Sequence, residues 1–276
     1  MNLLFCVDEN YTNKMLVTLY SLLENTEERN IHLYVVSKEV LSNEDRIRKF
    51  CQDYEISFHP IRVGEIFKDA PVSKRYPSTI YYRLLAHYYL PKDLDKVLYL
   101  DADILVINDI KPLYDTDVTG YLYGASSHSV IFETMDDINR ARVSSYENEE
   151  YYNSGVLVMN LENIRKEVKA EDIYRHIDEC INPLKLILPD QDILNTLYGH
   201  RVKSLPDVIY NYDTRLNLVY YKEDPANWNP DWVMENTVVL HYCGKDKPWD
   251  TLGRGKYDYL YKHYEGKLKK KMKENY

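Results

Sequence analysis

The chain has 276 residues, of which 45% are hydrophobic and 29% are charged. This length and composition suit one large α/β domain that buries a sizeable core. A formal net charge of −9 argues against a general nucleic-acid-binding protein, because such proteins usually present a basic surface.

Buried strands are predicted where short apolar runs occur. Four such runs lie in the first hundred residues, at 3–7, 31–37, 56–63 and 97–100. Continuous apolar runs are typical of parallel strands that are covered on both faces. Pro60 lies in the third run and indicates an edge strand or a bulge, because proline cannot donate a hydrogen bond to a neighbouring strand.

Helical patterns separate these strands. Leucines between residues 16 and 23 share one helical face, and a second helix is expected from Ser42, with Asp45 placed to complete a capping box. Residues 78–90 form a third helical pattern, which ends at Pro91. Alternating strands and helices predict an α/β fold with a doubly wound, mostly parallel sheet.

The second half of the chain is less regular. Strands are predicted at 121–126, 153–161 and 237–243, and a helix at 190–198. Between them, residues 211–232 are rich in asparagine and tyrosine and show no clear period. Long stretches of this kind in a compact domain are often functional loops, so we expect one here.

The C-terminal tail differs in charge from the rest of the chain. Residues 256–276 hold seven lysines and three acidic residues, which gives the tail a charge of +4 and leaves about −13 elsewhere. Apolar and aromatic residues recur among these lysines at near-helical spacing. The pattern fits either an amphipathic helix on an anionic membrane or a terminal helix docked on the core, and Gly266 interrupts the helix in both cases.

The four cysteines, Cys6, Cys51, Cys180 and Cys243, lie far apart and form no CxxC pair. We interpret them as reduced thiols of a cytosolic protein. The first residues fit no signal peptide, and no apolar run is long enough to span a bilayer. The expected location is the cytoplasm, with peripheral contact at the inner face of the plasma membrane if the tail binds lipid.

Asp101 and Asp103 directly follow the apolar run VLYL. Ligands of α/β proteins bind at the carboxyl ends of strands, and side chains two positions apart on a strand share a face, so the pair is placed to bind Mg²⁺ or Mn²⁺. Alternatively, the pair caps a turn or is ion-paired with lysine or arginine. Aspartyl phosphatases also carry such a pair after a strand, but they usually have threonine or valine where this chain has Leu105.

The stretch HYCGKDKPW follows the last predicted strand and carries further candidates. His241 offers a neutral imidazole to a metal ion, Gly244 permits close backbone approach, and Lys247 offers a point charge to a phosphate. A histidine at the end of a strand can equally be an ordinary core or surface residue.

Five motifs follow one another along the chain: CVDENY, LYLDADILV, YYNSGVLVMNL, LPDQDILN and HYCGKDKPW. In this order and spacing they resemble the retaining family 8 glycosyltransferases, which include bacterial lipooligosaccharide galactosyltransferases and glycogenin. The resemblance covers about residues 1–250 and leaves 251–276 as a separate tail. It implies a GT-A type, Rossmann-like α/β catalytic domain that binds a UDP-sugar and Mn²⁺ or Mg²⁺.

The resemblance also implies a role for each matching residue. Three would ligate the metal ion, and the others would bind the donor or surround the transferred hexose. The implied metal ligands are Asp101, Asp103 and His241; the implied uridine contacts are Cys6, Asp8, Asn10 and Tyr11; the implied contacts to the donor phosphates or sugar are Gly244, Lys247 and Arg83, with Ala102 as a further donor-binding residue; and the implied hexose contacts are Asn153, Asp190 and Gln191.

Several of these residues have a plainer interpretation from the sequence. Asp8 and Asn10 could cap the helix that follows them. Arg83 could form an ion pair at the edge of the core, and Asn153 could be a turn residue. Asp190 is well placed to be the N-cap of its helix, and a cap can also contact a sugar.

A reaction that retains the configuration of the anomeric carbon requires attack on the face from which the leaving group departs, or a covalent intermediate. Charge builds on the leaving diphosphate, where the metal ion, Lys247 and backbone N–H groups would stabilise it. Gln191 is neutral and therefore a poor nucleophile. We expect same-face attack in which the leaving phosphate accepts the proton of the acceptor, with Asp190 as the alternative nucleophile.

The acceptor is less well defined by these motifs. The resemblance implies transfer of glucose or galactose to a saccharide or lipid-linked saccharide in the synthesis of cell-surface polysaccharides. His128 stands where the bacterial galactosyltransferases carry an acidic acceptor contact, and residues 210–232 match no family pattern, although we expect them to shape the acceptor side. Two rival functions remain open, an aspartyl phosphatase and a non-catalytic module that binds UDP-sugars.

Overall fold

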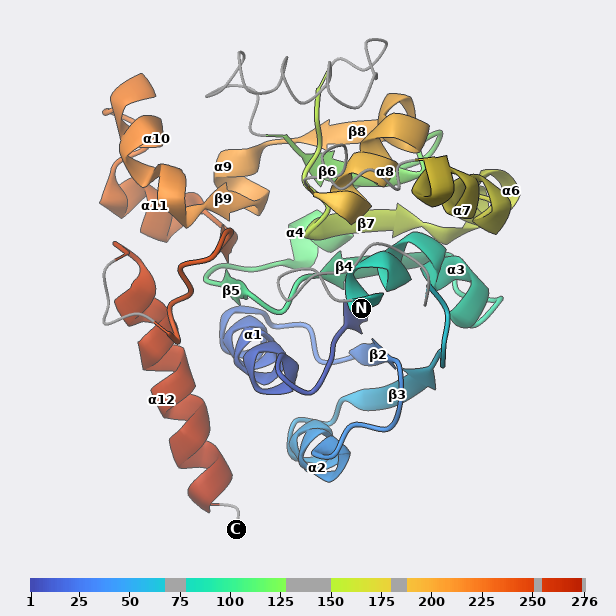
Figure 1. Cartoon of the computed structure of the whole chain (residues 1–276). Helices are drawn as coiled ribbons and strands as arrows, with labels where there is room; N and C mark the ends of the chain where they lie inside the picture. The colour runs from blue at the N-terminus through green and yellow to red at the C-terminus, as the bar shows by residue number, and fades with distance from the viewer. Residues whose placement is uncertain (68–77, 128–149, 180–187, 251–254, 275–276) are drawn as a thin grey trace.

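A seven-stranded sheet lies at the centre of the molecule, in the order β3-β2-β1-β4-β7-β6-β8 (Figure 1). The computed structural model describes the whole chain except residues 68–77, 128–149, 180–187, 251–254 and 275–276. Neighbouring strands are parallel except where β7 pairs with β4 and β6, so β7 runs against the other six. The strands are β1 (Asn2–Cys6), β2 (His32–Ser37), β3 (Ser57–Arg62), β4 (Lys96–Leu100), β6 (Tyr123–Ser126), β7 (Val156–Asn160) and β8 (Val202–Leu205). The predicted mostly parallel sheet is confirmed, and Pro60 lies in the edge strand β3 as expected.

Both faces of this sheet are buried. In β1, Leu3 and Phe5 pack into one core and Leu4 packs into the other, which is the alternation that a strand imposes. The first core is covered by α1 (Thr12–Asn25) and α2 (Glu44–Asp53). The second is covered by η1 (Ser78–Leu85), α3 (Ala86–Tyr89), α6 (Leu161–Glu167), α7 (Ala170–Glu179) and α8 (Pro189–Tyr198). The doubly wound architecture predicted from the sequence is therefore confirmed.

One local prediction about helices is wrong. The capping box does not form, because Ser42 Oγ donates to Glu9 Oε2 at 2.8 Å. The N-cap is Asn43, one residue after Ser42, and the helix begins at Glu44. A tertiary contact thus takes the side chain that the local pattern assigned to the cap. Residues 78–90 are helical as predicted, mostly as a 3₁₀ helix, with α3 alone in the α conformation.

The stretch 211–232 is not a structureless loop, so that prediction is also wrong. The helix α9 (Asp207–Tyr210) ends just before it. The stretch itself contains β9 (Tyr212–Asp213), η3 (Thr214–Leu216) and α10 (Asn217–Glu223), and α11 (Pro230–Asn236) begins within it. Tyr212 and Tyr220 are buried and pack against each other with ring centroids 4.5 Å apart. Burial of tyrosines with no regular spacing orders this segment, and a period search cannot detect such packing.

A second, three-stranded sheet in the order β5-β10-β9 carries the last strand to the centre of the molecule. In it, β10 (Val239–His241) lies antiparallel to β5 (Ile104–Val106) and parallel to β9. The register pairs His241 with Ile104 on one side and with Asp213 on the other. This sheet brings segments that are far apart in sequence to the carboxyl end of β4. The remaining short helices are α4 (Lys111–Tyr114) and η2 (Gly199–Arg201).

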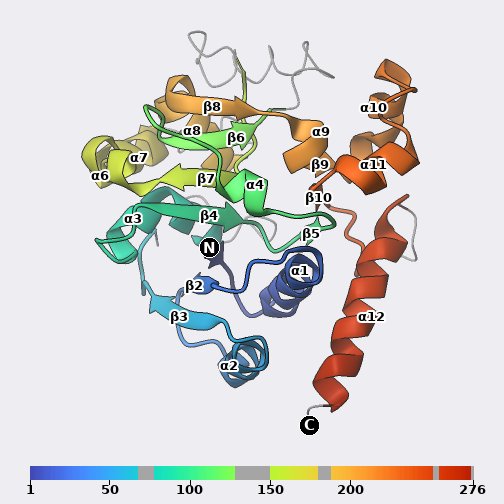
Figure 2. The same ribbon diagram turned by 180° about the vertical axis from the view of Figure 1, so that it is seen from behind.

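The tail forms α12 (Asp258–Glu274), which stands beside α1 in both views (Figures 1 and 2). Tyr261 and Leu268 are buried against the first core, and Lys267 Nζ lies 2.6 Å from a carboxylate oxygen of Glu24 on α1. Of the two alternatives for the tail, the structure shows the docked helix. Its apolar face is covered by the protein, and most of its lysines are exposed.

No helix among the described residues has the length and apolar composition needed to cross a membrane. Cys6, Cys51 and Cys243 are free thiols, and Cys180 lies outside the described residues.

Replacing Gly266 by alanine is expected to stabilise the protein. Gly266 lies inside α12, which continues through it, so the predicted interruption of the helix is wrong. A Cβ added at Gly266 meets no atom within 4 Å. Alanine avoids the backbone entropy that glycine loses in a helix, so the free energy of unfolding should rise by about 1 kcal/mol. Denaturant unfolding followed by circular dichroism measures this change. A lower midpoint for Gly266→Ala would show that α12 is not docked as described.

Candidate active site

Three potential metal ligands converge where β4 ends. Asp101 and Asp103 lie in the turn between β4 and β5, and His241 is the last residue of β10. His241 Nε2 lies 3.2 Å from Asp103 Oδ1 and 4.0 Å from Asp101 Oδ2, and one ligand atom of each residue lies within 4.8 Å of the others. The two aspartates are in a turn and not on a strand as predicted, but the turn still directs both carboxylates toward the same point. Main-chain bonds hold this turn, including Asp101 N–H to the carbonyl of Gly155 at 2.8 Å.

The imidazole of His241 is oriented by a residue that we did not predict. His241 Nδ1 lies 2.8 Å from Oδ1 of Asn211, which is fully buried. The side-chain amide of Asn211 donates in turn to Asn153 Oδ1 at 2.9 Å, so its nitrogen and oxygen are both assigned. Because an amide oxygen only accepts, His241 must donate from Nδ1 when it is neutral, which leaves Nε2 as a lone-pair donor facing the aspartates.

The amide network continues to Gln191. Asn153 Nδ2 donates to Gln191 Oε1 at 3.2 Å, and Asn153 Oδ1 accepts from the N–H of Gly155 at 2.9 Å. Asn153 is therefore both a turn residue and a link between Gln191 and Asn211. This chain of side-chain amides connects Gln191 to His241.

Gly155 is required by the close packing of these groups. A Cβ added at Gly155 would lie 2.4 Å from His241 Cε1, 2.8 Å from Asp101 Oδ2 and 3.0 Å from Asn153 Oδ1. No side chain fits without displacing the carboxylate or the imidazole. The glycine thus lets the antiparallel strand β7 approach the site closely.

Arg83 ties together two of the acidic residues. Its guanidinium lies 2.9 Å from Asp101 Oδ1 and 3.4 Å from Asp190 Oδ2, donates to the carbonyl of Ser154 at 2.8 Å, and stacks over the ring of Tyr99. The sequence alternative of an ion pair for Arg83 is therefore observed, within the candidate site itself. An ion pair this buried fixes both carboxylates in place.

Asp190 is not the N-cap of its helix, so that interpretation is wrong. The helix begins at Pro189, and Leu188 occupies the N-cap position. Asp190 instead accepts a hydrogen bond from Ser154 Oγ at 2.8 Å besides its contact with Arg83.

The two aspartates have different electrostatic environments. Burial raises the pKa of Asp101 above its ordinary value, and the neighbouring Arg83 only partly offsets this effect. Burial also acts to raise the pKa of Asp103, but Lys247 and His241 outweigh it and hold the pKa of Asp103 below its usual range. Positive charge thus surrounds a pair of carboxylates at the end of β4.

Lys247 is placed beside the aspartates. Its ammonium group is ion-paired with Asp103 Oδ2 and also donates to the carbonyl of Tyr242 at 2.7 Å. Gly244 has φ +84°, a left-handed conformation that favours glycine, and a Cβ there would lie 2.8 Å from Nη1 of Arg215. The loop after β10 can therefore carry Lys247 back over the turn between β4 and β5.

Two adjoining cavities meet at the aspartates. The larger, about 160 Å³, is lined by Arg83, Asp101, Asp103, Asn153, Ser154, Gly155, Leu188, Asp190, Gln191, His241, Cys243, Gly244 and Lys247. The smaller, about 100 Å³, is lined by Cys6, Val7, Asp8, Tyr11, Thr79, Asp101, Ala102 and Asp103. Among the residues named from the sequence as site residues, only Asn10 lines neither cavity, and His128 lies outside the described residues.

The smaller cavity is formed by the turn after β1. Asp8 Oδ1 accepts from the N–H groups of Asn10 at 2.9 Å and Tyr11 at 3.1 Å, so Asp8 caps the turn that precedes α1. The N-cap of α1 is Tyr11 and has no side-chain bond, so the interpretation of Asp8 and Asn10 as caps of the helix itself is wrong. Burial raises the pKa of the Cys6 thiol to about 12, and Cys6 is therefore protonated at neutral pH. The ring of Tyr11 lies against Trp249 in an edge-to-face contact, with ring centroids 6.0 Å apart.

Four residues of this arrangement were missed from the sequence: Tyr99, Ser154, Gly155 and Asn211. Tyr99 and Gly155 were interpreted only as parts of strands. A polar hydroxyl two residues before Asp101 was the signal for Tyr99, and in the structure this hydroxyl donates to Asp101 Oδ1. Asn211 lay in the stretch to which no structure was assigned, so nothing placed it beside His241.

Comparisons with known proteins agree with this arrangement. The family model described as glycosyl transferase family 8 matches residues 2–253. A lipopolysaccharide 1,2-glucosyltransferase of Escherichia coli is 29% identical over 257 residues, which cover 90% of this chain and 73% of that protein. The crystal structure of the galactosyltransferase LgtC with donor and acceptor sugar analogues superposes with a TM-score of 0.79 at 27% identity, covering 97% of this chain and 96% of LgtC. An active-site glutamine-to-glutamate mutant of LgtC superposes with a TM-score of 0.81 at 26% identity and the same coverage.

Proposed function

Because the chain belongs to glycosyl transferase family 8 and has its GT-A fold, we propose that it is a retaining hexosyltransferase that uses a UDP-sugar and a divalent metal ion. The observation that carries the proposal is the convergence of Asp101, Asp103 and His241 at the junction of two cavities. The acceptor is a saccharide or a lipid-linked saccharide.

The residues present fit a divalent metal ion. Two carboxylates and one imidazole are ligands that suit Mn²⁺ or Mg²⁺, and the bond from His241 Nδ1 to Asn211 leaves Nε2 to act as a ligand. Gly155 leaves the space that any side chain would fill. Asp101, Asp103 and His241 would hold the ion, and when bound it would supply positive charge to the diphosphate of the donor.

The two cavities divide the donor between them. Cys6, Asp8, Tyr11 and Ala102 line the smaller one, which we assign to the uridine, with Asn10 at its margin. The hexose would occupy the larger one, beside Asn153, Asp190 and Gln191. The diphosphate would then cross the aspartates, within reach of Lys247 and the backbone at Gly244. Relatives are named as transferring glucose or galactose, so the donor is UDP-glucose or UDP-galactose.

The environment of Asp190 favours direct attack by the acceptor on the face of the hexose from which UDP departs. Asp190 is held by Arg83 and Ser154, which lowers its strength as a nucleophile, and Gln191 is neutral. In the proposed reaction the bond between the anomeric carbon and the UDP oxygen breaks, and a bond to the acceptor oxygen forms on the same face. The acceptor proton passes to the leaving phosphate. Arg83 and Lys247 are placed to stabilise the developing negative charge.

Two relatives support a saccharide acceptor. One relative is named for transfer to lipopolysaccharide, and LgtC was solved with an acceptor sugar analogue. We place the catalytic domain at residues 1–250, in the cytoplasm, and treat 251–276 as a tail. Since the apolar face of α12 is covered, any contact with the inner face of the plasma membrane would be made by its exposed lysines.

A donor screen tests the proposed function. The protein is incubated with Mn²⁺ and a panel of nucleotide sugars, with and without saccharide acceptors, and free nucleoside diphosphate is measured. We expect UDP release from UDP-glucose or UDP-galactose, increased by an acceptor and abolished by EDTA. Donor binding without turnover over a broad acceptor panel would instead indicate a binding module. No observation favours the aspartyl phosphatase, because Arg83 and Tyr99 already engage the carboxylate of Asp101.

Replacing Asn211 by alanine is expected to weaken binding of the metal ion. Without the amide, the imidazole of His241 loses the acceptor that fixes its orientation, and such substitutions typically weaken metal affinity about 10- to 100-fold. Mn²⁺ binding in the presence of UDP, followed by electron paramagnetic resonance, measures this loss. Asn227→Ala, on the protein surface, is the control. Unchanged Mn²⁺ affinity in Asn211→Ala would show that Asn211 does not position the ligand.

A further inference from the structure

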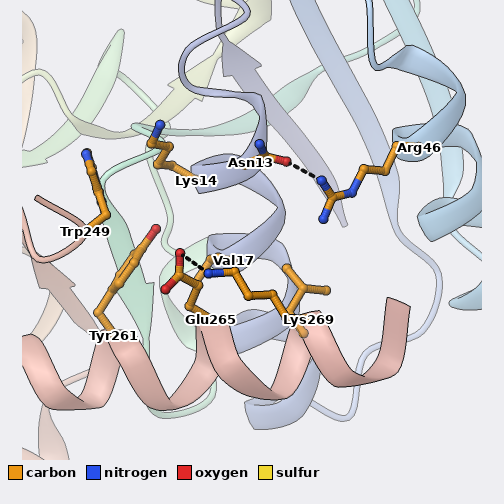
Figure 3. Close-up of a pocket in the computed structure, with 9 residues that line it drawn as sticks. Asn13, Lys14, Val17, Arg46, Trp249, Tyr261, Glu265 and Lys269 are labelled. Atoms are coloured by element: carbon orange, nitrogen blue, oxygen red, sulfur yellow. Dashed lines mark hydrogen bonds and ion pairs between the residues drawn. The ribbon is translucent and has the colours of Figure 1, made fainter. Parts of the chain in front are cut away.

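A third cavity, of about 240 Å³, lies between the tail helix and the body of the protein (Figure 3). It is lined by Asn13, Lys14 and Val17 of α1, Arg46 of α2, Trp249, and Tyr261, Glu265, Leu268 and Lys269 of α12. It shares no lining residue with the two cavities assigned to the donor. We call it the tail cavity, and the proposed reaction does not use it.

The tail cavity carries excess positive charge. Three of its lining residues are basic and one is acidic, and the acidic residue is already engaged, since Glu265 lies 3.0 Å from the ammonium of Lys269. Lys14 and Arg46 remain. Both are partly buried, and within the described part of the chain neither forms an ion pair with a carboxylate.

The contacts that Lys14 and Arg46 make are weak substitutes for an anion. Arg46 donates to Asn13 Oδ1 at 2.9 Å and lies 3.2 Å from the sulfur of Met272. Lys14 donates to a main-chain carbonyl and lies over the rings of Tyr11 and Trp249. Figure 3 shows that Lys14 extends from α1 and Arg46 from α2, on either side of Asn13. Partly buried cations with only neutral partners are best satisfied by an anionic ligand.

The tail cavity also has apolar lining residues. Val17, Tyr261 and Leu268 are buried, and the indole of Trp249 closes one end beside Lys14 (Figure 3). A ligand that fills this space would present an anionic group to Lys14 and Arg46 and an apolar part to α12. The guanidinium of arginine and the ammonium of lysine together match the oxygens of a phosphate.

We propose that the tail cavity is a binding site for a phosphate ester with an apolar body. This chemistry could come from the headgroup of an anionic phospholipid or from a soluble phosphate ester, and the same titration separates them. Dihexanoyl phosphatidic acid, below its micelle concentration, serves as the lipid-like probe. Phenyl phosphate, which has an apolar ring, serves as the soluble probe, and dihexanoyl phosphatidylcholine as the zwitterionic control.

Binding is measured by calorimetry in EDTA, and by tryptophan fluorescence with Trp249→Phe as the reference for the signal of the cavity. We expect saturable binding of at least one phosphate probe and weaker binding of the zwitterionic lipid. The double variant Lys14→Gln, Arg46→Gln should bind at least about tenfold more weakly, because it removes both charge-assisted contacts. Lys270→Gln, Lys271→Gln removes the same charge from exposed positions of α12 outside the cavity and should bind as the native protein does.

The outcomes separate this site from the rest of the molecule. Tight binding of phosphatidic acid alone supports a lipid headgroup, and equal binding of phenyl phosphate supports a soluble ester. The absence of saturable binding overturns the proposal. An equal loss of affinity in the cavity variant (Lys14→Gln, Arg46→Gln) and in the surface variant (Lys270→Gln, Lys271→Gln) also overturns it. Arg46→Gln alone provides the same test if the double variant is unstable. Binding that persists in His241→Ala shows that the probe does not occupy the donor site, so failure of the proposed function leaves this result intact.

Discussion

Replacing His241 by alanine is expected to reduce hexose transfer by about 10³-fold, which corresponds to about 4 kcal/mol of lost transition-state stabilisation. The imidazole is buried, lies 3.2 Å from Asp103 Oδ1 and is the only candidate ligand among the described residues that comes from outside the turn between β4 and β5. Without it, two carboxylates remain to hold the metal ion. UDP release from the donor identified in the screen measures the loss of activity, and calorimetry with Mn²⁺ measures the loss of UDP binding.

His200→Ala is the matched control, because His200 is exposed in η2 and contributes to neither donor cavity. It should retain full activity, while a thermal unfolding curve shows whether His241→Ala is folded. An aspartyl phosphatase would behave differently. It would hydrolyse phosphate esters with Mg²⁺, lose that activity in Asp101→Asn and keep it in His241→Ala. This second pattern would rule out the metal role of His241.

A methyl group at Gly155 is expected to reduce activity strongly without removing any functional side chain. The added Cβ would lie 2.4 Å from His241 Cε1 and 2.8 Å from Asp101 Oδ2, distances at which one of these groups must move. Overpacking of this kind costs about 1–3 kcal/mol in stability. Displaced ligands should also lower UDP binding in the presence of Mn²⁺ and reduce transfer by at least about 10²-fold.

Gly266→Ala is the control for this substitution, since the same methyl group there meets no atom within 4 Å. A crystal structure of Gly155→Ala would show which ligand has shifted. If Gly155→Ala keeps native transfer activity and native affinity for Mn²⁺, then β7 does not approach the candidate ligands as closely as described, and the geometry of the site is wrong.

The architecture followed from local patterns because it rests on burial that repeats along the chain. Apolar runs such as LLFCV and VLYL are continuous since both faces of their strands are covered, and this predicted the parallel sheet. The 3₁₀ conformation of η1 and the lost cap at Ser42 were not predictable in this way. Ser42 is taken by Glu9, a contact between segments that no local pattern relates.

The charged residues of the candidate site were predicted, and so were neutral ones such as Asn153 and Gln191. The neutral residues that orient or make room for the others, Asn211 and Gly155, were missed. Asp101, Asp103 and His241 stood out because carboxylates and a histidine at strand ends need a reason to be there. Asn211 and Gly155 act through distances to His241 that exist only once β7, β9 and β10 are placed. Lys247 was expected to contact phosphate, and in the structure it is ion-paired with Asp103. The two residues are 144 positions apart, so no local pattern reveals this pair.

A crystal grown with Mn²⁺ and UDP, with anomalous scattering recorded at the manganese edge, tests the central claim most directly. The account predicts one strong anomalous peak bonded to carboxylate oxygens of Asp101 and Asp103 and to Nε2 of His241, with the diphosphate of UDP against it. A peak elsewhere, or UDP bound with the imidazole turned away from both aspartates, would contradict it.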